Sequence, residues 1–205
     1  VNELKNAIEL KEQWAFKKNN RKKALVEFVS SNPTGPLHVG HTRGAIFGDT
    51  LASLLKNVGF SVTREYYIND AGTQIEALCR SAYSRYEEAL GKKYNADNNE
   101  YPGDYLKKVG KNLVDEFGDS LLSSDNKPNL EKIKKHTLSV MIDQIKKDLL
   151  DLGVIMDNFV SESSLYRNGK VQEAIDYLSK LGLIYKGVLE KPKGCLLYTS
   201  DAADE

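Results

Sequence analysis

The chain has 205 residues, of which 40% are hydrophobic and 28% are charged, and its 29 basic and 29 acidic residues give a formal net charge of zero. This composition excludes a disordered or fibrous chain. The balanced charge does not indicate a nucleic-acid binder, so any contact with RNA must depend on a small basic region of the surface.

The first elements in chain order are a helical lead-in, a strand and a second helix. Residues 3–20 carry scattered apolar side chains in a charged background, so we expect a helical lead-in over residues 1–23. The apolar run at residues 24–29 is typical of a strand, and the SSNPTGP sequence after it predicts a rigid loop. From Val39 apolar residues recur at helical spacing until Gly59, a natural helix stop.

The chain then continues the pattern of a parallel sheet. Residues 61–68 predict the next strand and residues 72–90 the next helix, which together give a βαβα unit. Residues 91–128 are polar and contain two turn-rich stretches, YNADNNEYPGDY and SSDNKPN, so we interpret them as an insertion between two halves of the domain. An amphipathic helix is predicted at residues 138–152.

The C-terminal part predicts further pieces of a doubly wound α/β sheet. We expect a strand at 158–161, a helix at 170–181 and a strand at 183–189. The composition changes at Gly194, and the last eleven residues, CLLYTSDAADE, resemble the in-frame translation of a sequencing adapter. We therefore expect residues 195–205 to be a non-native tail, the alternative being a genuine short tail, and both ends of the chain to be cut.

Several absences bear on the class of protein. No run approaches the roughly 18 apolar residues of a membrane span, and the start lacks a secretory signal pattern. We therefore expect a cytoplasmic protein that does not bind a membrane. Cys79 and Cys195 form no CxxC and have no histidine pair at metal-ligand spacing, so no structural metal site is expected. Cys79 is predicted to be a small buried hydrophobic residue.

The chemistry is concentrated where the first loop becomes a helix. His38 and His41 lie three residues apart with Gly40 between them. The helix N-terminus favours an anion, and open α/β sheets bind ligands at this edge. A nucleoside triphosphate fits this place, with both histidines donating to an α-phosphate under attack by a carboxylate and Gly40 leaving room for adenine. Alternatively, an isolated histidine near a helix start is a cap or a surface residue.

Glu27 and the later glycines need separate explanations. Glu27 is predicted to lie within an apolar strand, where an unpaired carboxylate would be costly and calls for a cationic partner. An internal salt bridge would satisfy it equally well. Gly44 and Gly48 continue the four-residue spacing from Gly40, and we attribute both to close packing.

Two stretches give these residues a family resemblance. The sequences VEFVSSNPTGPLHVGH and YYINDAGTQ resemble arginyl-tRNA synthetases of class I, in which HVGH is the form of the HIGH motif. A looser resemblance continues through FVSESSLYRNGKVQEAIDYLSKLGLIYKG and covers most of residues 24–194. Other class I synthetases and nucleotidyltransferases share HxGH but lack these two longer sequences.

The resemblance implies a fold and a reaction. The fold is an incomplete, Rossmann-like class I catalytic domain over residues 24–194, with a largely helical insertion at about 91–128. In this reaction L-arginine and ATP, with Mg²⁺, give arginyl-adenylate and pyrophosphate, and the arginyl group then passes to the terminal ribose of tRNA(Arg). A monomer is expected. The KMSK-like loop lies beyond Gly194, so the chain alone should be inactive.

The resemblance also implies roles for single residues. Pro36, His38, Gly40 and His41 would bind ATP, with the two histidines catalytic. Glu27 would select the guanidinium, and Asn32 would hold the α-amino and carboxylate end unless it is a simple turn residue. Asp70 and Gln74 are expected to support the site, although Asp70 could instead cap the following helix.

Two other functions remain open. The chain could belong to a different HxGH nucleotidyltransferase that acts on a small molecule without tRNA. It could also be a non-catalytic, synthetase-like module that binds tRNA or a protein.

Overall fold

The computed structural model describes residues 1–11, 14, 21–94, 101–122, 130–184 and 187. These residues fall into two compact units, Val1–Ser164 and Leu165–Glu205, which are described separately. The predicted lead-in helix is present as α1 (Asn2–Leu10), whose side chains are not buried. Most of the later part of that prediction, and the predicted tail at 195–205, lie outside the described residues.

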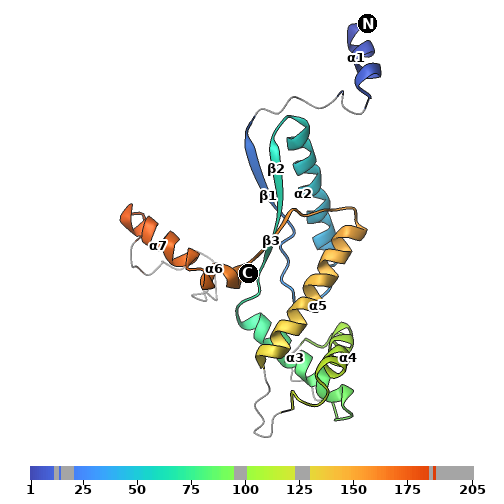
Figure 1. The fold of residues 1–205 in the computed structure, drawn as a ribbon, viewed down its shortest axis with the longest axis vertical. Helices are drawn as coiled ribbons and strands as arrows, with labels where there is room; N and C mark the ends of the chain where they lie inside the picture. Colours follow the sequence, from blue (N-terminus) through green and yellow to red (C-terminus); the bar gives the residue numbers. More distant parts are fainter. Residues whose placement is uncertain (12–13, 15–20, 95–100, 123–129, 185–186, 188–205) are drawn as a thin grey trace, which may run out of the picture. The chain divides into compact units, whose positions relative to one another are not determined.

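The first unit contains a parallel sheet of three strands in the order β1 (Lys23–Glu27), β2 (Ser61–Ile68) and β3 (Asn158–Ser161) (Figure 1). Both pairings are parallel, with Lys23 opposite Ser61 and Glu65 opposite Asn158. The carboxyl ends of the strands therefore meet at one edge, where ligands bind in open α/β sheets. The predicted parallel topology is confirmed.

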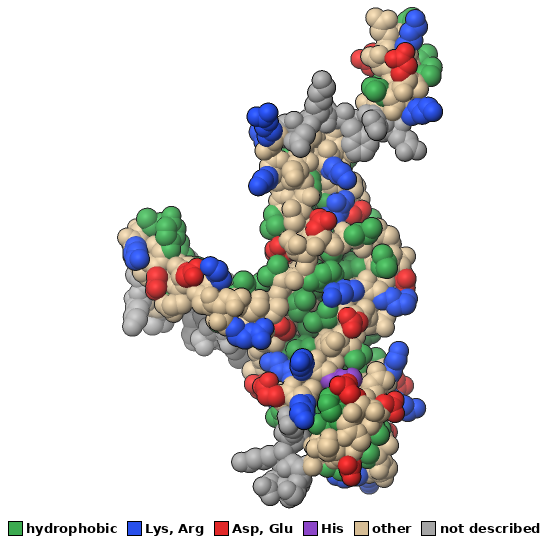
Figure 2. All heavy atoms as spheres, viewed as in Figure 1, with side chains coloured by type: hydrophobic (Ala, Val, Ile, Leu, Met, Phe, Trp, Pro, Cys, Tyr) green, Lys and Arg blue, Asp and Glu red, His purple; other side chains and the backbone are tan. Residues whose placement is uncertain are grey.

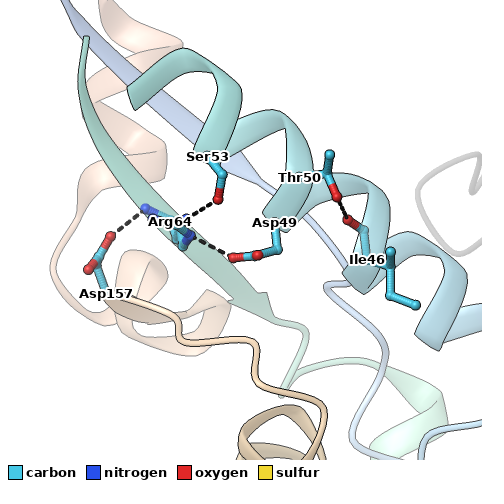
Figure 3. Close-up of polar contacts among 6 residues, drawn as sticks. All are labelled: Ile46, Asp49, Thr50, Ser53, Arg64 and Asp157. Carbon is cyan, nitrogen blue, oxygen red and sulfur yellow. Dashed lines mark hydrogen bonds and ion pairs between the residues drawn. The ribbon is translucent and has the colours of Figure 1, made fainter. Parts of the chain in front are cut away.

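Helix α2 (Val39–Asn57) crosses over between β1 and β2, and Arg64 fastens it to the sheet (Figure 3). The Arg64 guanidinium donates to Asp49 at 2.9 Å and to Ser53 at 3.1 Å, both on α2. Its backbone N–H donates to Asp157, just before β3, at 2.7 Å. One residue of β2 thus holds the helix and the neighbouring strand. Gly59, at φ 95°, follows the end of the helix as predicted.

A second layer consists of α3 (Thr73–Ala89), α4 (Tyr105–Phe117) and α5 (Leu130–Asp151), which share one hydrophobic core (Figure 1). The insertion at residues 91–128 contains the helix α4, of which Leu106, Val109 and Leu113 are fully buried along one face. A helical insertion agrees with the family resemblance. Helix α5 also begins earlier than the predicted residue 138.

A second core lies between the sheet, α2 and α5. Its buried members are Ala45, Tyr66, Ile68, Ile145, Leu149 and Val154. Figure 2 shows hydrophobic side chains gathered on the surface where β2, α2 and α5 meet in Figure 1. Helix α5 contributes to both cores, so it joins the sheet to the α3–α4 layer within the first unit.

Two short helices follow the sheet. Helix α6 (Glu162–Arg167) starts directly after β3, and α7 (Lys170–Lys180) lies in the second unit, close to its predicted bounds. The strand predicted at residues 183–189 is not present at Leu183, Ile184 or Gly187, and its other residues lie outside the described part. Among the described helices, none is both long and apolar enough to cross a membrane.

Candidate functional site

His38 and His41 form a stacked pair at the N-terminus of α2. His38 is the N-cap residue, and its Nδ1 accepts a hydrogen bond from the Gly40 N–H at 3.1 Å. The Nδ1 atom of His41 accepts from the His38 N–H at 3.3 Å, and the two ring centroids are 3.7 Å apart. The histidines therefore satisfy two of the free N–H groups at the helix start, as a capping box does.

This arrangement selects one tautomer of both rings. A neutral imidazole whose Nδ1 accepts a hydrogen bond carries its proton on Nε2. Burial lowers the pKa of His41 below its usual 6.5, and the repulsion that a protonated His38 would exert lowers it further. The neutral form of His41 is thus favoured at physiological pH, with the Nε2–H group left to donate to a ligand.

Gly40 has a local reason for being glycine. A Cβ at this position would lie 3.0 Å from Cε1 and 3.2 Å from Nδ1 of His38, tighter than ordinary contact. Glycine at position 40 therefore leaves room for the His38 ring. This reason is independent of the space for adenine that the sequence analysis expected there.

The histidines border a polar pocket with a volume of about 370 Å³. Its lining residues are Asn32, Thr34, Gly35, Pro36, His38 and His41. A larger groove of about 570 Å³ runs along α2 past Phe47, Leu51 and Leu54, and its walls are almost wholly apolar. The polar pocket, with its donors at a helix start, is the better candidate for an anionic ligand.

Neither pocket offers a metal site of its own. The lining of the polar pocket contains no carboxylate, the ligand that Mg²⁺ prefers. Within the described part of the chain, no group of three or more His, Cys, Asp or Glu residues could hold a metal ion.

The sequence predicted Glu27 within an apolar strand, but the structure places it at the end of one. It is the last residue of β1 and is exposed. Its carboxylate accepts a hydrogen bond from the Ser30 hydroxyl at 2.7 Å, and no ion pair to Glu27 is present among the described residues. The alternative of an internal salt bridge therefore finds no support among the described residues, and a cation from solution could reach the carboxylate.

Ser30 is a functional candidate that the sequence analysis missed. Val29 and Ser30 have φ values of 68° and 39°, a conformation that a β-branched valine rarely adopts. Because of this bend, the Ser30 hydroxyl takes the place of a backbone carbonyl as the partner of β2. The hydroxyl accepts from the Tyr67 N–H at 3.1 Å and donates to the Glu27 carboxylate. Ser30 therefore connects Glu27 to β2.

Asn32 and Gln74 are brought together. The Asn32 side-chain amide donates to the Gln74 carbonyl oxygen at 2.8 Å. Asn32 also starts a tight turn, since its backbone carbonyl accepts from the Thr34 N–H at 2.8 Å. The turn interpretation and the binding interpretation of Asn32 are thus compatible.

Asp70 caps a helix, but not the one that follows it in sequence. Its carboxylate accepts from the Ser163 N–H at 2.8 Å and from the Ser161 and Ser163 hydroxyls at 2.6 and 2.9 Å. Burial of the carboxylate opposes its ionisation, but these hydrogen bonds outweigh burial and lower the pKa of Asp70. Asp70 joins the end of β2 to the first turn of α6, so the alternative in which Asp70 caps α3 was wrong.

Two tyrosines far away in sequence hold the loop between β1 and α2. The buried Tyr66 hydroxyl donates to the Ser31 carbonyl at 2.9 Å and lies 2.7 Å from the Ser31 hydroxyl. The Tyr105 hydroxyl, from α4, donates to the Thr34 carbonyl at 2.5 Å. Tyr66 begins the YYINDAGTQ stretch and Tyr105 lies in the insertion, but neither contact could be predicted, because each depends on the tertiary fold.

The remaining predictions concern packing. A Cβ on Gly48 would lie 2.2 Å from Phe28, so its packing role is confirmed. A Cβ on Gly44 would meet nothing within 4 Å, so the same explanation was wrong for Gly44. Cys79 is buried as predicted, and burial raises the pKa of its thiol to about 11.

Sequence comparisons place this geometry among known proteins. The family described as tRNA synthetases class I (R), catalytic domain, matches residues 3–188. An arginine–tRNA ligase of Wolbachia pipientis wMel is 52% identical over 192 residues, 93% of this chain and 33% of the relative. An arginine–tRNA ligase of Ruegeria sp. strain TM1040 is 54% identical over 173 residues, 84% of this chain and 30% of the relative. The chain thus spans about a third of the length of these relatives.

Solved structures agree in fold. A Campylobacter jejuni protein assigned as an arginyl-tRNA synthetase superposes with a TM-score of 0.79 at 34% identity, over 91% of this chain and 41% of that one. The Thermus thermophilus arginyl-tRNA synthetase superposes with a TM-score of 0.51 at 21% identity, over 85% of this chain and 30% of that one, which supports the fold alone.

Proposed function

This chain belongs to the family of class I arginyl-tRNA synthetases, and we propose that the whole protein is an arginine–tRNA ligase. In the proposed first step the carboxylate of L-arginine attacks the α-phosphate of ATP, forming arginyl-adenylate and releasing pyrophosphate. In the second step a hydroxyl of the terminal ribose of tRNA(Arg) attacks the arginyl carbonyl and releases AMP.

The observation that carries this proposal is the stacked pair of His38 and His41 beside the polar pocket. Each ring keeps its Nδ1 bound to the helix start, which leaves the Nε2–H group for the ligand. Adenylate formation builds negative charge on the α-phosphate and needs donors that are already in position, not a covalent nucleophile. The two histidines meet this need, with Pro36 and Gly40 as neighbouring parts of the ATP site.

The arginine end of the proposed site lies beside Glu27 and Asn32. A carboxylate can accept two parallel hydrogen bonds from a guanidinium, which gives both energy and direction. Glu27 is exposed and oriented by Ser30, so we assign it to the arginine side chain. Asn32, which lines the polar pocket and is supported by Gln74, is assigned to the α-amino and carboxylate end.

Several parts of the proposal concern partners of the whole protein. Mg²⁺ would arrive with the ATP phosphates, since the lining of the polar pocket supplies no carboxylate, and no step is assigned to the ion. We further propose a cytoplasmic monomer that binds tRNA(Arg), with residues 24–194 as part of the catalytic domain and 91–128 as its insertion.

The test is ATP–pyrophosphate exchange by the full-length protein in the presence of tRNA. We expect exchange that depends on arginine, is not supported by lysine or glutamine, and falls at least about 100-fold in His41→Ala, a typical loss for a donor to a developing charge. Exchange without arginine would favour another HxGH nucleotidyltransferase. Binding of tRNA with no exchange and no charging would favour a non-catalytic module. The 205-residue chain alone is expected to show no exchange.

A further inference from the structure

Tyr105, the first residue of α4, reaches the loop that lines the polar pocket. Its hydroxyl donates to the Thr34 carbonyl at 2.5 Å. Its ring lies next to Gly35, where an added Cβ would be 3.4 Å from the hydroxyl oxygen. Thr34 and Gly35 both line the pocket, whereas Tyr105 does not. Tyr105 therefore contacts the wall of the pocket from behind.

The position of the Tyr105 ring is fixed by its own surroundings. A Cβ on Gly103 would lie 2.1 Å from the ring, so only glycine at this position leaves the ring where it is. The next residue, Leu106, is fully buried in the core shared by α3, α4 and α5. The hydroxyl is thus presented from the first residue of a helix whose next residue is anchored in the core.

The hydrogen bond fixes the orientation of a whole peptide group. The described peptide bonds are all trans, so the Gly35 N–H points away from the Thr34 carbonyl that Tyr105 holds. The Thr34 N–H is already engaged with the Asn32 carbonyl at 2.8 Å. Both backbone polar groups of Thr34 are therefore occupied, which restrains the chain directly before Gly35 and Pro36.

We propose that Tyr105 is a positioning residue for the polar pocket, in which it fixes the segment Thr34–Gly35–Pro36 against which the nucleotide binds. The inference rests on the proposed function, because that function assigns ATP to this pocket. Ser31 and Asn32 are held from β2 and α3, whereas Thr34 is held from the insertion. The insertion thereby acquires a specific task in nucleotide binding.

The test compares Tyr105→Phe with Tyr86→Phe in the full-length protein. Tyr105→Phe keeps the ring beside Gly35 and removes only the hydrogen bond to Thr34. Tyr86→Phe is the control for general destabilisation, because it removes a buried tyrosine hydroxyl of the same helical layer, away from the loop. That hydroxyl donates to the Gly118 carbonyl at 2.8 Å and accepts from the Leu121 N–H at 3.3 Å. Gly103→Ala serves as a second variant that displaces the Tyr105 ring.

Two measurements give separate answers. We expect Tyr105→Phe to raise the KM for ATP about fivefold, the effect of one ordinary hydrogen bond, with kcat and the KM for arginine nearly unchanged. Gly103→Ala should raise this KM at least as much, and Tyr86→Phe should not. In the protein without ligands, hydrogen exchange of the backbone amides in residues 35–41 should become faster in Tyr105→Phe and in Gly103→Ala, but not in Tyr86→Phe.

The outcomes distinguish this inference from the proposed function. If the parent protein activates arginine but Tyr105→Phe changes neither the KM for ATP nor the exchange of residues 35–41, the inference is wrong and the proposed function stands. Equal effects of Tyr105→Phe and Tyr86→Phe would also overturn it, because they would indicate general destabilisation. If the parent protein does not use ATP, the proposed function and the nucleotide role of Tyr105 both fall, whatever the exchange data show for the loop.

Discussion

The side-chain amide of Asn32 donates a hydrogen bond to the Gln74 side chain at 2.8 Å, joining the loop after β1 to the first turn of α3. The two residues are 42 positions apart in sequence. Because the amide nitrogen of Asn32 points to Gln74, the orientation of its carbonyl oxygen is set as well, and that oxygen remains an acceptor for a ligand.

Loss of the Gln74 side chain should therefore weaken arginine binding. We expect Gln74→Ala to raise the KM for arginine about three- to tenfold in the full-length protein, the range for one lost hydrogen bond that orients a binding group. Gln144→Ala is a matched control, because Gln144 makes an exposed bond to Asp148 on α5. An unchanged KM for arginine in Gln74→Ala would mean either that Asn32 does not bind arginine or that Gln74 does not orient Asn32.

Glu27 and Ser30 should act as a unit in arginine binding. Glu27→Gln removes the charge that we assign to the guanidinium, and we expect a rise of at least about 100-fold in the KM for arginine, as for a lost charge-assisted pair. Ser30→Ala should raise it about fivefold by freeing the carboxylate. The double variant should resemble Glu27→Gln alone, since Ser30 acts through Glu27. Fully additive effects would show that Ser30 has a separate role.

The pKa of His41 can be measured directly by NMR. In the folded chain the His41 ring should titrate below 6.5, because burial and the charge of His38 both disfavour its cation. His38→Asn keeps an N-cap acceptor and removes the charge, so the pKa of His41 should rise but stay below 6.5. The unfolded chain takes up this proton more readily, so stability should fall as pH drops through this range. A His41 pKa above 6.5 would contradict the neutral donor.

The regular elements that face a core could be predicted because their patterns are local. The strand at 61–68 and the helix ending before Gly59 follow from residue type and spacing alone. The family resemblance predicted a helical insertion, but the bounds of α4 were not predicted from the residues, although Leu106, Val109 and Leu113 have helical spacing. Turn-forming residues on both sides dominated the interpretation. A three-residue apolar pattern in a polar segment is a weak signal.

The details of the site could not be predicted, because they depend on tertiary contacts and on unusual backbone angles. Glu27 was expected inside a strand, but the chain bends at Val29, which has a φ that its side chain disfavours. Asp70 finds its partner Ser161 after 91 residues, a separation that no local pattern reports. The location of His38 and His41 at a helix start was predictable, since the loop and helix signals lie next to each other in sequence.

Asp70 should make stability depend on pH at the acidic end. Its pKa is lowered in the folded chain, so its stabilising contribution is present above the ordinary aspartate pKa of about 3.9 and is lost as pH falls through the folded value. Asp70→Asn should cost about 1 kcal/mol at pH 7, and the difference from the parent chain should shrink below pH of about 4. Urea unfolding at several pH values tests this, with the exposed Asp143→Asn as control. A difference independent of pH would exclude the carboxylate's charge as the cause.

Gly44 and Gly48 lie one helical turn apart on α2 and should respond oppositely to the same substitution. Gly48→Ala places a methyl group 2.2 Å from the start of the Phe28 side chain, which cannot swing away at that point, so we expect a loss of about 1–3 kcal/mol in unfolding free energy. Gly44→Ala meets nothing within 4 Å and gains helix propensity, so it should be neutral or stabilise the chain by up to about 1 kcal/mol. Phe28 follows β1 directly, so its displacement should also reach the bend at Val29 and weaken arginine binding in the full-length protein. Chemical unfolding of both variants decides the matter, because equal losses would mean that α2 tolerates no side chain on this face and that the contact with Phe28 is not the cause.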